Sequence, residues 1–214
     1  MNAYGKQLRT LLSRRERGCF ARLDSPGKIQ DFLDTLRINF EEGGRTVLSP
    51  RRVLRERRAH CLEASLFAAA CLAYHDRPAL LVDLQTVHTD YDHVIAVFKQ
   101  DRLWGAISKT NRAMLRWRDP VYRTIRELAM SYFHEYYQPN GKKSLRVVSK
   151  PFDLRRYQPA RWVTAEEDLE WIADDLDDSP HFSVVPRKAI AKLRDAGRIE
   201  LRAMKLVEWR KKSG

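Results

Sequence analysis

The chain has 214 residues, of which 43% are hydrophobic and 32% charged, and it carries a formal net charge of +12. Its length fits one domain with a core of its own, with or without a small appended lobe. Three cysteines are too few for a disulfide-stapled secreted domain, and no apolar run approaches the length that spans a membrane. The first residues lack the apolar stretch of a secretory signal, so we expect a cytoplasmic protein that makes no membrane contact.

The first sixty residues are predicted to be mainly helical. Apolar residues at helical spacing occupy 6–18 and 28–42, and Ser49-Pro50 pairs a capping residue with proline at a first helical position. The next predicted helix, 61–74, has almost no polar face beyond its first turn. A helix that is apolar nearly all round is normally buried at the centre of a domain. We therefore expect 61–74 to be the central helix of the fold.

Strands are predicted directly after this helix. The segment 79–84 is a short apolar run, and 92–98 is rich in β-branched residues. The segment 103–107 follows 92–98 after a polar turn, which favours a hairpin. The remaining predicted elements are a helix at 119–137 opened by Asp119-Pro120, an edge strand at 145–148, a helix headed by a capping box at 164–167, a helix at 186–197, and a tail at 199–209 that suits either strand or helix.

This order predicts an α+β fold in which the central buried helix packs on a small antiparallel sheet, with further helices flanking it. We expect residues 1–150 to form the core together with the N-terminal helices. Residues 151–214 are expected to form a helical extension packed on that core.

Cys61 stands at the first position of the central helix, where backbone N–H groups and the helix dipole favour a thiolate. A thiolate nucleophile needs a base within hydrogen-bond reach and a group that orients the base. His93, beside Asp92 at the head of the second strand, is the candidate base. Ser108 directly follows the third strand and is the candidate that orients the imidazole, with Asn111 as a second candidate.

Other residues near this pattern have alternative interpretations. His60 precedes Cys61 but is expected to point away from the thiol, and Cys71 is expected to be a small buried core residue. For Cys61 itself, packing within a Leu- and Ala-rich helix is the alternative to catalysis. The aromatic residues of 132–137 are predicted to pack rather than to line a cleft. No sequence motif implies a metal site or an organic cofactor.

The order of these features resembles that of the transglutaminase-like superfamily, which has a papain-like cysteine hydrolase or acyltransferase fold. Within that superfamily, the chain is similar to small proteins of bacterial type. The resemblance covers roughly residues 28–137. It rests on Cys61 at the start of an apolar helix, His93 at the start of the next-but-one strand, and Trp104 in the strand after it. It implies that Cys61 is the nucleophile and His93 the base. The position of the family's aspartate or asparagine matches Ser108, whose hydroxyl can orient an imidazole but brings no charge to stabilise an imidazolium.

These residues predict a cysteine-dependent hydrolase or acyltransferase that acts on an amide or peptide bond of a protein or peptide, through a Cys–His dyad or a weakened triad. Water and an amine both remain open as acyl acceptors, and the sequence does not indicate an oligomeric state. Three interpretations of the six arginines within 45–58 remain open: they select an acidic substrate, they pair with the acidic run 166–178, or most of them form an ordinary solvated surface. Two alternatives belong to other classes. One is a catalytically degraded binding module of the same fold, motivated by Ser108, and the other is a nucleic-acid-binding protein, motivated by the charge alone.

Overall fold

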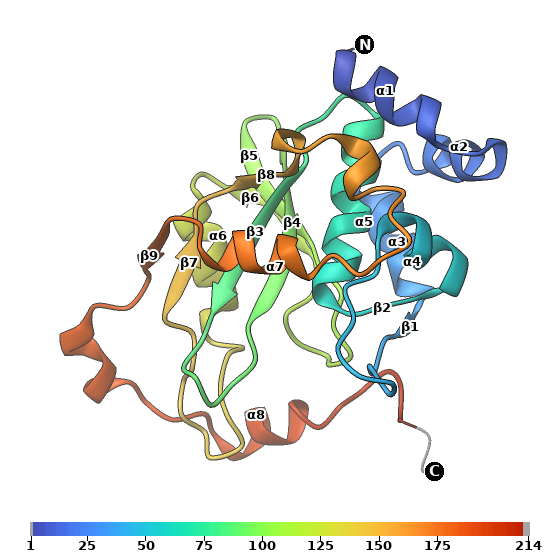
Figure 1. The fold of residues 1–214 in the computed structure, drawn as a ribbon. Coiled ribbons are helices and arrows are strands. Elements are labelled where there is room, and N and C mark those ends of the chain that lie inside the picture. Colours follow the sequence, from blue (N-terminus) through green and yellow to red (C-terminus); the bar gives the residue numbers. More distant parts are fainter. Residues whose placement is uncertain (1, 212–214) are drawn as a thin grey trace.

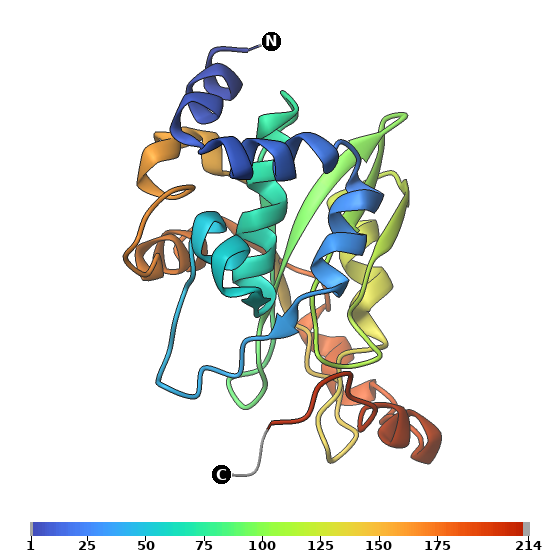
Figure 2. The same ribbon diagram turned by 90° about the vertical axis from the view of Figure 1, so that its right-hand side faces the viewer.

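A seven-stranded antiparallel sheet and a set of helices pack on opposite sides of the buried helix α5 (Cys61–Tyr74) in the computed structural model, which describes residues 2–211 (Figures 1 and 2). The helices beside α5 are α1 (Ala3–Leu11), α2 (Arg14–Arg22), α3 (Pro26–Asp34) and α4 (Pro50–Glu56). The chain is therefore a mixed α+β protein, and the central helix occupies the predicted residues.

The main sheet has the strand order β6-β5-β4-β3-β7-β9, and β8 pairs with the other end of β3. The strands are β3 (Leu80–Gln85), β4 (His93–Gln100), β5 (Leu103–Ile107), β6 (Arg118–Tyr122), β7 (Val147–Ser149), β8 (Phe152–Asp153) and β9 (His181–Ser183). A separate parallel pair joins β1 (Arg37–Ile38) to β2 (Arg58–Ala59). The predicted hairpin is confirmed, because β4 and β5 pair antiparallel in register from Ala96↔Ile107 to Gln100↔Leu103.

The remaining helical elements follow the sheet in the chain. They are α6 (Ile125–Phe133), α7 (Glu170–Asp177), α8 (Arg198–Ala203) and the 3₁₀ turns η1 (Leu154–Arg156), η2 (Pro159–Arg161) and η3 (Arg187–Lys192). Residues 151–214, expected to be helical, thus also supply β8 and β9 to the main sheet. Among residues 2–211, no helix combines the length and the apolar composition needed to cross a membrane.

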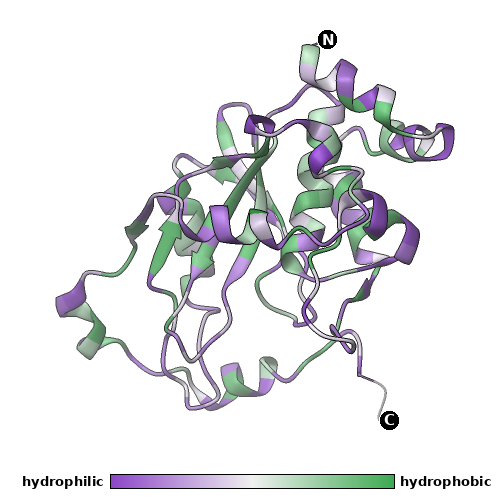
Figure 3. Cartoon of the chain, viewed as in Figure 1, coloured by the Kyte–Doolittle hydropathy of each residue, from purple (hydrophilic) through white to green (hydrophobic). Residues whose placement is uncertain are grey.

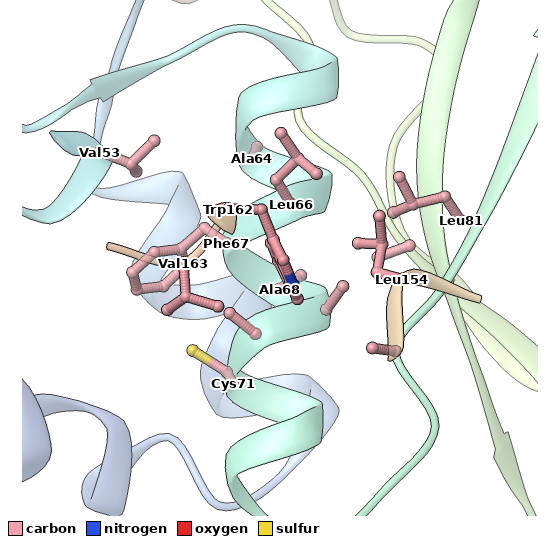
Figure 4. Packing of buried hydrophobic residues seen from close by; sticks show 14 of the residues in the cluster. Val53, Ala64, Leu66, Phe67, Ala68, Cys71, Leu81, Leu154, Trp162 and Val163 are labelled. Atoms are coloured by element: carbon pink, nitrogen blue, oxygen red, sulfur yellow. The ribbon is translucent and has the colours of Figure 1, made fainter. Parts of the chain in front are cut away.

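Helix α5 is surrounded by the largest of the three hydrophobic clusters of the described residues. Every residue from Leu62 to Tyr74 is buried. Figure 4 shows Leu66, Phe67 and Cys71 of this helix among side chains from α4, β3 and the segment 154–163. Cys71 is fully buried, as predicted for a core residue. Figure 3 shows hydrophobic residues concentrated on α5 and on the strands, with hydrophilic residues on α4.

The central strands β3 and β4 are buried on both faces of the sheet over most of their length. Leu81 and Ala96 face the α5 cluster, whereas Val82 and Ile95 belong to a second cluster that includes Leu128 of α6. Strands covered on both faces read as continuous apolar runs rather than as alternating patterns. This explains why 79–84 and 92–98 were recognisable as buried strands.

Several predicted helices differ from those observed. The segment 6–18 forms two helices, because Ser13 starts a second one with a capping box in which Ser13 Oγ accepts from the Glu16 backbone N–H and Glu16 accepts from the Ser13 N–H. Helix 28–42 ends early, at Asp34. The predicted capping box at 164–167 is wrong, since α7 begins at Glu170. The predicted helix 186–197 is the 3₁₀ turn η3.

The predicted helix 119–137 is also wrong over its first turn. Residues 118–122 form β6, and the helix begins at Ile125, capped by the side chain of Thr124. β6 is an edge strand, so Pro120 lies where a missing backbone N–H need not break a ladder between two strands. The prediction of an edge strand at 145–148 is wrong as well. The strand there, β7, lies inside the sheet, because β9 pairs with it on the side away from β3.

Candidate active site

Cys61 and His93 line one open cleft of about 470 Å³. Cys61 is the first residue of α5 and is partly exposed, whereas His93 is the first residue of β4 and is 5% exposed. The two elements are joined next to these residues, because Ser65 Oγ donates a hydrogen bond of 2.9 Å to the Val94 carbonyl. This contact fixes the head of the helix against the head of the strand, and so it holds thiol and imidazole in one site.

Ser108 orients the imidazole of His93. His93 Nε2 lies 2.7 Å from Ser108 Oγ, and the serine hydroxyl donates its own proton to the Leu115 carbonyl. Since a hydroxyl carries only one proton, Ser108 Oγ accepts from His93, and Nε2 is therefore the protonated ring nitrogen. This leaves Nδ1 as the nitrogen available to take a proton from the thiol.

Gln30 of α3 holds Ser108 in place. Its side-chain amide forms two hydrogen bonds to the Ser108 backbone, donating to the carbonyl at 2.9 Å and accepting from the N–H at 3.0 Å. Gln30 is 6% exposed and also donates to Asp34. Sequence reasoning missed this residue. The available signal was a polar residue next to Ile29 within an otherwise apolar helix face.

Asn111 does not contact His93. Its side-chain amide donates to the carbonyl of Trp209 at 2.9 Å and accepts from the Trp209 N–H at 2.8 Å. The Asn111 carbonyl also accepts from the N–H of Glu208. Asn111 lines the cleft but fastens the C-terminal segment to its rim, so Ser108 is the residue that orients the imidazole.

His60 is a second imidazole at the thiol, which corrects the expectation that it points away. Its Nε2 lies 2.9 Å from the Thr46 carbonyl, and a carbonyl can only accept, so Nε2 carries a proton. Burial lowers the pKa of His60, but its hydrogen bond to Cys61, the negative charges of Cys61 and Glu63, and the Thr46 carbonyl outweigh burial and raise the pKa to about 9. His60 is therefore an imidazolium at neutral pH.

The pKa of Cys61 is held well below its ordinary value. Burial acts to raise this pKa, but hydrogen bonds from His60 and His93 and the positive charges of both rings outweigh it. The other two cysteines show the opposite shift. Burial raises the pKa of Cys19, and it raises that of fully buried Cys71 well above its ordinary value. Cys61 is thus the one cysteine of the three whose surroundings favour the thiolate.

Glu63, in the first turn of α5, stabilises the residues around the site through hydrogen bonds. Its fully buried carboxylate accepts hydrogen bonds from the side chains of Asn39 and Thr46 and from the backbone N–H groups of Leu48 and His60, all between 2.8 and 3.0 Å. It also lies 3.4 Å from Nε2 of His60. The carboxylate ties the loop after β1 to the first turn of α5 and stabilises the charged form of His60.

The arginines within 45–58 line no part of this cleft. Five of the six pair with carboxylates: Arg51 with Glu16 at 2.7 Å, Arg55 with Glu166 at 2.7 Å, Arg52 with Asp168 at 2.8 Å, Arg58 with Glu56 at 2.9 Å, and Arg45 with Glu170 at 4.0 Å. The predicted pairing with the acidic run 166–178 is therefore confirmed for Arg45, Arg52 and Arg55, whereas Arg51 and Arg58 pair with carboxylates of α2 and α4. The acidic and basic residues that line the cleft, apart from its two histidines, are Glu41, Asp90, Asp92, Lys109, Arg112 and Glu135.

No protein-family model and no curated protein matches this chain. Within residues 2–211, no group of three or more His, Cys, Asp or Glu side chains is arranged to hold a metal ion. The functional conclusion therefore depends on the geometry of the cleft.

Proposed function

We propose that this protein is a cysteine-dependent hydrolase or acyltransferase of the transglutaminase-like type, acting on an amide or peptide bond. The observation that carries the proposal is the position of Cys61. It stands at the head of a buried helix, in an open cleft, between two imidazoles that lower its pKa. Such surroundings are typical of a reactive cysteine, whereas a structural cysteine is buried in apolar surroundings, as Cys71 is.

The geometry supports a two-step acyl transfer. In the resting site the thiol proton lies on Nδ1 of His93. The Cys61 thiolate attacks the amide carbonyl carbon, whose π electrons move to its oxygen. The tetrahedral intermediate collapses when the C–N bond breaks, and His93 returns the proton to the departing amine. Water or a second amine then attacks the thioester while His93 takes its proton, and the sulfur leaves with that proton restored to it.

The two histidines have different roles in this proposal. A group with a pKa near 9 keeps its proton at neutral pH, so His60 is suited to hold the thiolate by its charge rather than to act as a base. His93, with Nε2 bound to Ser108 and Nδ1 available, is suited to move the proton. The charge of His60 also compensates in part for the absence of an aspartate at Ser108, because an imidazolium stabilises the thiolate directly.

The proposal predicts that 4-nitrophenyl acetate acetylates Cys61. This activated ester needs no recognised substrate side chain, so it tests the nucleophile alone. We expect intact-protein mass spectrometry to detect one acetyl group, peptide mapping to place it on Cys61, and hydroxylamine to remove it as it removes thioesters. The matched control is Cys71→Ser, which should be acetylated like the unsubstituted protein, whereas Cys61→Ser should not form the thioester.

The same experiment separates the proposal from its rivals. A binding module with a degraded site predicts no acetylation of Cys61 beyond that of an ordinary thiol. In a nucleic-acid-binding protein, the basic side chains would be free to contact phosphates, yet five of the six clustered arginines are paired with carboxylates.

A further inference from the structure

Tyr136 lines the cleft that holds Cys61 and His93, and its hydroxyl has no partner. The residue is 3% exposed, and its buried hydroxyl makes no hydrogen bond within the part of the chain that the structure describes. Neighbouring tyrosines do not share this feature. The hydroxyl of Tyr132 donates to the Arg116 carbonyl at 3.0 Å, and that of Tyr137 donates to the Glu200 carbonyl at 2.6 Å.

A buried hydroxyl without a partner costs free energy, because folding removes its hydrogen bonds to water and provides no other hydrogen bond. The backbone gives Tyr136 little freedom to avoid this position. Its N–H donates to Phe133 and its carbonyl accepts from Ser144, so it is held in the turn that follows α6. A phenylalanine would fill the same space without the unpaired group, which indicates that the hydroxyl serves a partner that arrives in the cleft.

The first turn of α5 supplies donors to the same cleft. The N–H groups at the head of a helix have no acceptor within the helix, and Cys61 and Leu62 occupy its first two positions. The N–H of His60 is already taken by Glu63, and that of Ala64 by the His60 carbonyl. When Cys61 attacks a carbonyl carbon, negative charge develops on the carbonyl oxygen. This charge thus forms beside the positive end of a fourteen-residue helix.

We propose that the Tyr136 hydroxyl, together with backbone N–H groups at the head of α5, donates a hydrogen bond to the oxyanion that forms when Cys61 attacks a carbonyl. This inference rests on the proposed function and adds a catalytic residue to it. When the C–S bond forms, the negative charge moves from the sulfur to the carbonyl oxygen, and a donor fixed in advance stabilises that charge without rearrangement. The proton stays on Tyr136 throughout, and the oxyanion reverts to a carbonyl when the leaving group departs.

The electrostatic surroundings keep Tyr136 a donor. Burial raises its pKa well above the ordinary value, and the negative charges of Cys61, Asp83 and other nearby aspartates raise it further. The hydroxyl therefore stays protonated at neutral pH.

Tyr136→Phe tests the inference with two probes of Cys61. Acetylation by 4-nitrophenyl acetate passes through an oxyanion, whereas alkylation by iodoacetamide displaces iodide at a saturated carbon and forms none. We expect the variant to lower the acetylation rate about 10²–10³-fold, the usual effect of losing one oxyanion donor, and to leave the alkylation rate unchanged. The variant keeps the ring and loses only an unpaired group, so its melting temperature should not fall.

The control is Tyr132→Phe, which removes a paired hydroxyl from α6 outside the cleft and should lower the melting temperature without a selective loss of acetylation. Equal losses with both probes in Tyr136→Phe would overturn the inference, because the hydroxyl would then act on the thiolate. An unchanged acetylation rate would overturn it as well. Both of these outcomes leave the proposed function standing, whereas an unsubstituted protein that fails to react with 4-nitrophenyl acetate contradicts the proposed function and removes the inference with it.

Discussion

Replacing His93 with glutamine is expected to lower the turnover of 4-nitrophenyl acetate about 10²–10⁴-fold and to make the acetylated protein accumulate, the usual range for losing a positioned general base. 4-Nitrophenolate is a good leaving group, so acylation needs little help from an acid. Hydrolysis of the thioester does need a base to take a proton from water. Glutamine keeps a donor for the Ser108 hydroxyl but has no nitrogen that accepts a proton at this pH.

Two substitutions serve as comparisons for His93→Gln. His88 is exposed and lies outside the cleft, so His88→Gln should leave turnover unchanged. His60→Gln should mainly raise the pKa of Cys61, because it removes one of the two charges that lower that pKa. Its loss of turnover should therefore be recovered in part at higher pH, whereas that of His93→Gln should not. If His60→Gln traps the acetylated protein and His93→Gln does not, the assignment of the base is wrong.

Glu63→Ala is expected to reduce the free energy of unfolding by about 3–5 kcal/mol, the range for removing one member of a buried charged network. The substitution removes the carboxylate that accepts from four donors, those of Asn39, Thr46, Leu48 and His60, of which Asn39 and Leu48 are buried. For a chain of this size, such a loss corresponds to a fall in melting temperature of roughly 10 °C. Thermal unfolding followed by circular dichroism measures both quantities.

Glu63→Gln refines this prediction. All the groups that face Glu63 through hydrogen bonds are donors, so an amide, with one oxygen and one donating nitrogen, satisfies only part of them. We expect Glu63→Gln to reduce the free energy of unfolding by less than Glu63→Ala does and by more than the exposed control Glu167→Ala does. The control should stay within about 0.5 kcal/mol of the unsubstituted protein. A Glu63→Ala variant as stable as the control would contradict the role of the carboxylate in joining the loop after β1 to α5.

The central helix and the hairpin beside it could be predicted from the sequence because their signals are local. A run apolar on every face identifies a buried helix, and its first residue was predicted correctly as Cys61. The prediction of a helix start at Asp119-Pro120 is wrong because an edge strand also tolerates proline after a residue that can cap a helix. Which strand lies at the edge depends on the strand order of the sheet, and the local sequence does not determine that order. Strand β9 was missed because three residues carry too little pattern.

The candidate site divides in the same way. Cys61, His93 and Ser108 each begin or follow a strong element, so the predicted order of helix and strands was enough to select them. His60, Gln30 and Tyr136 were missed or given other roles, because what matters in each is the direction of a side chain. That direction is set by Thr46, by the Ser108 backbone and by the turn after α6, all contacts between segments distant in sequence or made only in the folded chain.

The pH dependence of the alkylation of Cys61 by iodoacetamide tests the account most directly. Thiolate is the reactive form, and a lowered pKa means that it is lost only when the pH falls through that lowered value. The ion pair with His60 persists up to the His60 pKa of about 9. We therefore predict that the alkylation rate of Cys61 reaches its plateau at a pH well below that of an ordinary thiol, while Cys71 stays unlabelled in the folded protein. A Cys61 rate that keeps rising about tenfold per pH unit up to about pH 8.5, as an ordinary thiol's does, would contradict the account.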